Sequence, residues 1–224
     1  DYRAYQKGAW VVHMLRARLG EGPFRRCVQT YLQRYGLGTV TTEDLRAVAE
    51  EVSGQGLDRF FDQWVFGGGL PRLKVTYAWS DKTRLARISV QQTQAQDAKD
   101  RVFQVPTKVR FLVAGQRIDR DLWIERPQHD FYFPLAAEPC VVRFDPEYTV
   151  LAEVTFDVAK AMLYEQLEDG NDVIGQVLAA RSLAKERDTK TVERLKEILN
   201  QAVFYGVRCE AARALEEIHT DEAL

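Results

Sequence analysis

The first residues of the chain contain one side chain whose type and place suit chemistry, the phenol of Tyr5. It precedes Lys7-Gly8-Ala9 at the start of an expected helix, where Gly8 would permit close approach of another backbone. A tyrosine hydroxyl normally stays protonated at neutral pH, so it can donate a hydrogen bond to an oxyanion that develops beside a metal. A tyrosine here can equally be a half-buried helix residue, and the residue types alone leave both interpretations open.

No metal-ligand pattern accompanies this tyrosine. The three histidines lie in separate segments, and none belongs to an H-E-x-x-H motif or is paired with a cysteine or carboxylate at ligand spacing. They are His13, His129 and His219. We expect each of them to be a surface residue or a satisfied helix residue, and we predict no metal-binding or cofactor-binding residue in this chain.

Nucleophilic catalysis and phosphate binding find no support either. The sequence has no G-x-S-x-G motif, and its three cysteines are far apart and odd in number, which fits neither a disulfide framework nor a metal knuckle. We expect Cys27, Cys140 and Cys209 to be buried small apolar residues. Gly67-Gly68-Gly69 lacks the lysine and helix that follow a phosphate loop, so it is predicted to be a turn between domains.

Composition and charge exclude several classes of protein. The 224 residues are 46% hydrophobic and 29% charged, as in ordinary globular proteins. The formal charge of −2 offers no field that favours nucleic acid, and no apolar run reaches the roughly 18 residues of a membrane span. The chain lacks an initiator Met and starts inside an expected helix, which suggests a portion of a longer protein. The sequence does not indicate the cellular compartment of the protein.

Three segments with different periodicity must position these side chains. Residues 1–70 show helical spacing, and the third of four expected helices should begin after Thr41-Thr42 and stop at Ser53-Gly54. Residues 71–156 alternate apolar and polar side chains, which predicts six to seven antiparallel strands and a small β-sandwich. Helical spacing returns over 157–224.

The last segment contains an internal repeat. Residues 177–183 match residues 209–215 at an offset of 32, which is close to the period of two-helix solenoid repeats. We therefore predict that 157–224 begins a HEAT-like helical repeat domain that continues in the parent chain. An accidental similarity between two alanine-rich helices is the alternative.

The N-terminal motifs resemble those of the aminopeptidase N family of gluzincin-type zinc metallopeptidases. The resemblance covers residues 1–71 through several short signatures in the same order. They are Tyr5-Gln6-Lys7-Gly8-Ala9, His13-Met14-Leu15, Leu19-Gly20, Phe24, Tyr31, Thr41-Thr42-Glu43-Asp44-Leu45, Ser53-Gly54, Phe60-Phe61-Asp62-Gln63-Trp64 and Gly69-Leu70-Pro71. The resemblance implies a multidomain α and β protein: the helical end of a thermolysin-like catalytic domain, an antiparallel β-sandwich, then HEAT-like repeats.

The resemblance also implies a function. Tyr5 matches the tyrosine of the family's Y-x-K-G motif, whose hydroxyl helps zinc to stabilise the tetrahedral intermediate of peptide hydrolysis. The family's H-E-x-x-H motif, third zinc ligand and substrate-amine loop lie upstream of that tyrosine. The expectation is a fragment of a zinc-dependent aminopeptidase that removes N-terminal residues from peptides, inactive alone because it lacks the zinc site. The alternative is a non-catalytic, aminopeptidase-like scaffold that binds proteins through the sandwich and the repeats.

Helices that normally pack on the rest of a catalytic domain would expose an apolar face in the isolated chain. We therefore expect self-association through the exposed face of the catalytic-domain helices, such as the helix Val11–Leu19.

Overall fold

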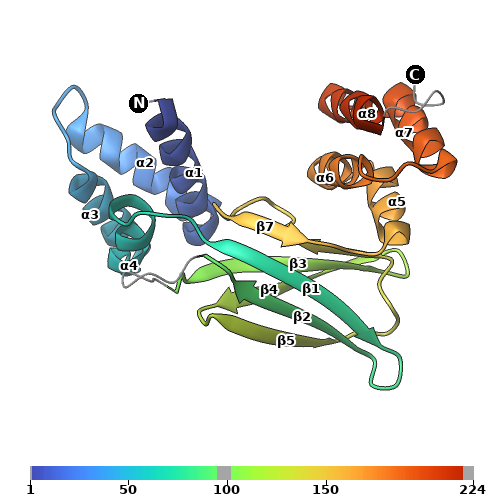
Figure 1. Ribbon diagram of the computed structural model, residues 1–224. Coiled ribbons are helices and arrows are strands. Elements are labelled where there is room, and N and C mark those ends of the chain that lie inside the picture. Colours follow the sequence, from blue (N-terminus) through green and yellow to red (C-terminus); the bar gives the residue numbers. More distant parts are fainter. Residues whose placement is uncertain (1, 95–101, 219–224) are drawn as a thin grey trace. The chain divides into compact units, whose positions relative to one another are not determined.

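The computed structural model describes residues 2–94 and 102–218. It divides into two compact units, one of Asp1–Arg72 with Thr149–Glu153 and one of Leu73–Tyr148 with Val154–Leu224. Figure 1 shows the order of their elements along the chain. Among the described residues, none of the helices combines the length and hydropathy needed to cross a bilayer.

The first unit is helical. Its elements are α1 (Tyr2–Leu19), α2 (Glu21–Tyr35), α3 (Thr42–Ser53), α4 (Asp58–Phe61) and the π-helical turn η1 (Asp62–Phe66). Gly20, with a φ of 81°, separates α1 from α2. The buried side chains come from every element and include Leu15, Cys27, Val48 and Phe61.

The ends of α3 follow from local chemistry. The Thr41 side chain accepts a hydrogen bond from the backbone of Asp44, and the Asp44 carboxylate accepts from the backbone of Thr41, which together satisfy donors that a helix start leaves free. At the other end Gly54 adopts a left-handed conformation with φ 68°, and its N–H donates to the Glu50 carbonyl at 2.8 Å. The predicted stop at Ser53-Gly54 is confirmed, and the helix begins at Thr42, one residue earlier than predicted, with Thr41 as its cap.

Seven strands follow the first group of helices in the described part of the chain. They are β1 (Arg72–Ser80), β2 (Leu85–Gln92), β3 (Val105–Val113), β4 (Gln116–Ile124), β5 (Gln128–Pro134), β6 (Val141–Phe144) and β7 (Glu153–Phe156). Four form a sheet in the order β5-β2-β1-β7, and three form a sheet in the order β4-β3-β6. The Phe111 ring of β3 contacts the Phe133 ring of β5 at 5.6 Å between centroids, so the two sheets share apolar contacts.

Four helices complete the second unit. They are α5 (Lys160–Glu168), α6 (Val173–Leu183), α7 (Thr189–Gln201) and α8 (Tyr205–Ile218). The two segments of the predicted repeat fall on α6 and α8, which pack against each other. The equivalent residues Ala179 and Ala211 are both fully buried in one apolar cluster. The same cluster contains the equivalent pair Leu183, which is fully buried, and Leu215, which is almost fully buried.

The cysteines correct one expectation. Cys27 is buried as predicted, but Cys140 is only partly buried and Cys209 is exposed on α8. Helical spacing predicted where α8 lies, whereas the burial of one of its faces depends on neighbours that are distant in sequence.

Candidate functional site

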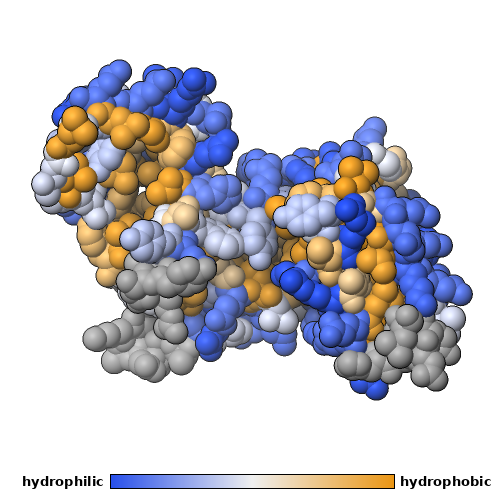
Figure 2. Space-filling view, turned by 90° about the horizontal axis from the view of Figure 1, so that it is seen from above, coloured by the Kyte–Doolittle hydropathy of each residue, from blue (hydrophilic) through white to orange (hydrophobic). Residues whose placement is uncertain are grey.

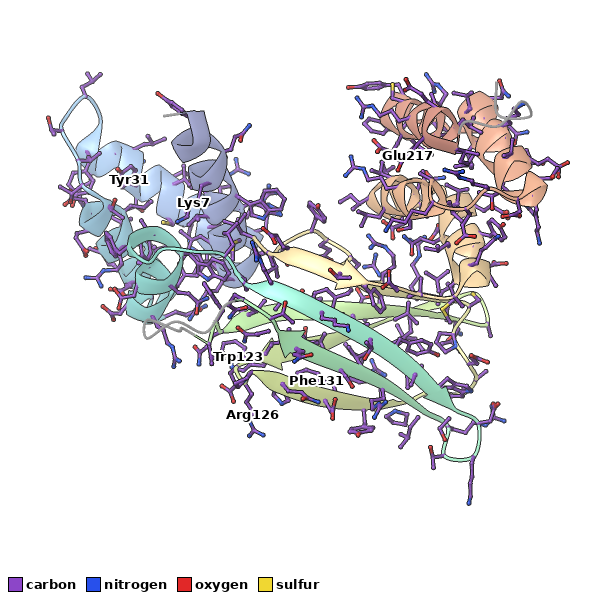
Figure 3. The ribbon with its side chains drawn as sticks, in the orientation of Figure 1. Lys7, Tyr31, Trp123, Arg126, Phe131 and Glu217 are labelled. Carbon is purple, nitrogen blue, oxygen red and sulfur yellow. The ribbon has the colours of Figure 1, made fainter. Side chains whose placement is uncertain are left out.

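Tyr5 lies in the first turns of α1, and its side chain is 81% exposed. Lys7, labelled in Figure 3, lies two residues further along the same helix. The buried residues of α1 are Val11, Met14, Leu15 and Leu19, so the apolar stripe of the helix faces the core of the first unit and Tyr5 does not. The phenol is therefore free of any packing role among the described residues of that unit.

The exposed side of α1 continues beyond Tyr5. Gly8, Ala9 and Val12 follow at positions three, four and seven residues on, so they share a helix face with the tyrosine, and all are exposed. Val12 is 43% exposed. We call Tyr5, Gly8, Ala9 and Val12 the α1 face. A Cβ at Gly8 would meet no atom within 4 Å, so the close backbone approach expected at this glycine does not occur among the described residues.

No metal-binding cluster lies near this face. Within residues 2–94 and 102–218, no group of three or more His, Cys, Asp or Glu side chains could hold a metal ion. His13 is exposed on α1, and His219 lies outside the described residues. The side chains present therefore do not fit a zinc ion, and we derive no chemical step from a metal held by this chain.

His129 lies far from Tyr5 in the sequence, on β5 of the other unit. Its ring stacks on that of Phe131, labelled in Figure 3, with 4.3 Å between centroids. Its Nδ1 is buried and has no hydrogen-bond partner in the described part of the chain. This contact with an aromatic ring fits a packing role for the imidazole.

Apolar side chains also reach the surface of the second unit. Val203, Phe204 and Tyr205 precede or begin α8 and are 98%, 46% and 66% exposed. Figure 2 shows that hydrophobic residues lie among hydrophilic ones on the face seen from above. Their exposure could not be predicted from the sequence, because three adjacent apolar residues between helices are buried as readily as exposed.

Comparison with known proteins identifies the class of the first unit. Residues 1–64 match the Peptidase family M1 domain. The chain is 37% identical over 75 residues to Aminopeptidase M1-D of Oryza sativa subsp. japonica, which covers 34% of this chain and 9% of that protein. It is 33% identical over 89 residues to Aminopeptidase N of Haemophilus influenzae, which covers 40% of this chain and 10% of that protein. The matched part thus spans about a tenth of these relatives.

The fold has a solved counterpart. The structure matches the crystal structure of Legionella pneumophila aminopeptidase A in complex with aspartic acid with a TM-score of 0.76, over 97% of this chain and 27% of that chain. At 18% identity this likeness shows a shared multidomain fold of helices and sheets. The first unit, then, is peptidase-like. The match of residues 1–64 to the Peptidase family M1 domain confirms the resemblance to the aminopeptidase N family.

Proposed function

We propose that this chain is part of a zinc-dependent aminopeptidase that removes N-terminal residues from peptides. The observation that supports this most directly is the family M1 match, which covers residues 1–64 and therefore the motif around Tyr5. The reported relatives are named as aminopeptidases, which favours a peptidase over the non-catalytic scaffold.

The proposal includes a division into three parts. Residues 1–70 are the helical end of a thermolysin-like catalytic domain, 71–156 a β-sandwich, and 157–224 the start of a HEAT-like repeat domain. The contact between Phe111 and Phe133 supports the sandwich, because these rings come from the two different sheets. The packing of α6 on α8 supports the repeats, because stacked repeat units bury their apolar faces against each other.

Tyr5 is the residue to which we assign a role in catalysis. Its hydroxyl would donate a hydrogen bond to the carbonyl oxygen of the scissile peptide as that oxygen gains negative charge. Such a bond strengthens as the charge develops, so it lowers the barrier more than it tightens substrate binding. The exposure of the ring supports this assignment, since the phenol is accessible to a substrate. Zinc would be held by residues of the parent protein that this chain lacks, and the chain alone would then be inactive.

The test is Tyr5→Phe in the complete enzyme, because this change removes only the hydroxyl. We expect kcat to fall by about 10²-fold, as for the loss of one oxyanion donor, with KM little changed and zinc content equal to that of the parent. Tyr132→Phe is the matched control, since Tyr132 is 56% exposed on β5. If kcat were unchanged in the Tyr5 variant, the Tyr5 hydroxyl would have no role in catalysis.

A further inference from the structure

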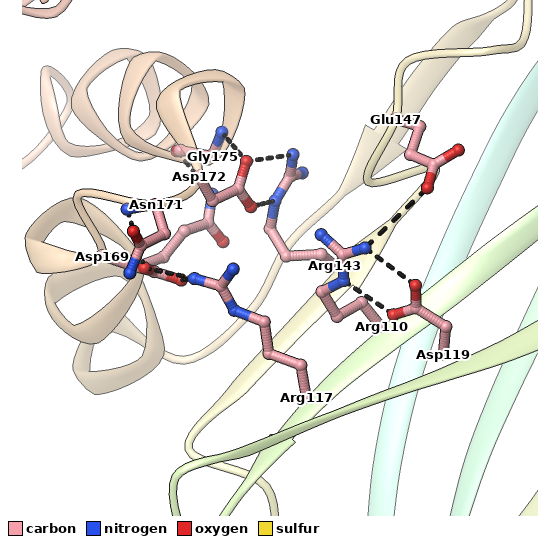
Figure 4. A network of polar contacts seen from close by, with 10 residues as sticks. Arg110, Arg117, Asp119, Arg143, Glu147, Asp169, Asn171, Asp172 and Gly175 are labelled. Carbon is pink, nitrogen blue, oxygen red and sulfur yellow. Dashed lines mark hydrogen bonds and ion pairs between the residues drawn. The ribbon is translucent and has the colours of Figure 1, made fainter.

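A buried ion pair joins the sheets and the helices within the second unit. Arg143 of β6 donates from Nε to Oδ2 of Asp172 at 2.7 Å, and the two side chains are only 4% and 8% exposed. Asp172 is the residue before α6, and its Oδ1 accepts a hydrogen bond from the Gly175 backbone at 2.8 Å. Figure 4 shows this arrangement. One carboxylate thus both caps a helix and neutralises a strand arginine.

The register of the three-stranded sheet shows why Arg143 needs this carboxylate. Arg143 lies directly opposite Arg110 of β3, and Arg110 lies directly opposite Asp119 of β4. Asp119 pairs with Arg110 at 2.7 Å, and the hydrogen bond from Arg110 holds the pKa of Asp119 below its usual range. Like charges directly opposite each other destabilise a sheet. The carboxylate that pairs with Arg143 comes from the turn before α6, so the helices complete the charge balance of the sheet.

The fit around this pair leaves no room for a larger residue at position 175. A Cβ there would lie 2.5 Å from Oδ2 of Asp172 and 3.0 Å from Nε of Arg143. Glycine is less favourable than alanine inside a helix, so its presence in the first turn of α6 is explained by the space that the ion pair requires.

Neighbouring polar contacts extend the same junction. Arg117 of β4 donates to Asp169, in the same turn, at 2.6 Å, although this pair is more exposed. Within the helices, Gln166 of α5 donates to the Gly175 carbonyl at 2.8 Å, and Gln176 of α6 donates to the Leu167 carbonyl at 2.9 Å. Any movement at Asp172 is thereby shared between α5 and α6.

We propose that Arg143, Asp172 and Gly175 form a clamp that fixes the α5–α6 hairpin on the three-stranded sheet and makes sheet and hairpin open as one body. This coupling goes beyond the proposed function and does not depend on it. A buried charge without its partner is strongly destabilising. If the hairpin left the sheet, Arg143 would lose the carboxylate of Asp172 or become exposed to solvent.

Hydrogen exchange of backbone amides at increasing urea concentration tests the clamp in the full chain. In the parent protein, amides of α5–α6 and of β3 and β6 should lose protection at the same urea concentration. The double variant Arg143→Met with Asp172→Asn removes both charges together while asparagine still caps α6. We expect the hairpin amides to lose protection at lower urea than the sheet amides, and to exchange faster without urea by on the order of tenfold. Loss of protection at one shared concentration would overturn the clamp.

Gly175→Ala is the second variant, because it keeps every charge. Alanine favours a helix over glycine, so an α6 stabilised only by its own helix would exchange more slowly. The clamp predicts the opposite, faster exchange of the hairpin amides, and slower exchange would overturn it. Arg194→Met is the matched control, since Arg194 pairs with Glu168 within the helices and both side chains are partly exposed. In this control variant, the sheet amides and the hairpin amides should still lose protection at the same urea concentration.

Discussion

At the scale of single residues, Gly54 shows how backbone conformation can matter without side-chain contacts. Its φ is 68°, and a Cβ there would meet no atom within 4 Å. Gly54→Ala should therefore destabilise the chain by about 1–2 kcal/mol, from the cost of the left-handed conformation alone. Urea unfolding measures this. Gly56→Ala, with equally open surroundings and no positive φ, is the control and should cost less than about 0.5 kcal/mol; equal effects would contradict the argument.

Residues differ in how far sequence alone could predict their roles. Thr41 and Gly54 were predictable because capping depends on a few adjacent residues. Arg143 was not, because its partner lies 29 residues away and an arginine in a strand is ordinarily solvated. The signal available in the sequence was its position between the apolar Val142 and Phe144, and the structure shows that this four-residue strand is buried throughout. Tyr5 was selected through its motif, and its catalytic role stays a prediction.

At the scale of elements, the start of α7 is tied to α5 by charge. Asp188 caps α7, and the hydrogen bond from Lys160 of α5, aided by Thr191, lowers the pKa of Asp188 to about 2. A carboxylate with a lowered folded pKa contributes stability above its unfolded pKa and loses it as the pH falls through the folded value. The contribution should therefore be present at pH 5 and disappear between about pH 4 and pH 2. Because Asp188 is 43% exposed, solvent keeps it small.

Urea unfolding of the parent and of Asp188→Asn across pH 2 to 6 measures this contribution. Asparagine also caps helices, so the difference between the two reports mainly the charge. We expect the parent to have the larger free energy of unfolding at pH 5. The gap, which is the difference in this free energy between parent and variant, should decrease toward pH 2. In a Lys160→Met background the gap should be smaller at every pH. A gap that stays constant with pH would show that the charge of Asp188 does not stabilise the fold.

Element positions were largely predictable, because periodicity is a local property. The spacing predicted four helices in residues 1–70 and six to seven strands in 71–156, and the described residues contain corresponding helices and seven strands. The π-helical turn Asp62–Phe66 was not distinguished from an α-helix, since both place Trp64 on a buried face. Which strands pair was not predictable either, because β6 and β3 are brought together by long-range packing.

At the scale of the whole molecule, the α1 face is a surface of the first unit that the described residues leave uncovered. It presents Tyr5 at 81% and Val12 at 43% exposure, with only Gly8 and Ala9 between them. Small residues allow close approach of another surface, and exposed apolar groups favour burial in a contact. We therefore predict that the isolated chain self-associates through this face.

Light scattering over a range of protein concentrations tests this prediction. The apparent mass should rise with concentration for the parent and stay that of a monomer for Val12→Glu, because a buried carboxylate without a partner opposes association. Val203→Glu is the control, since Val203 is 98% exposed in the second unit and is not part of the α1 face. If Val203→Glu abolished association and Val12→Glu did not, the contact would lie on the apolar residues before α8. A parent chain that remains monomeric at high concentration, with no apolar surface detectable by a dye, would contradict self-association altogether.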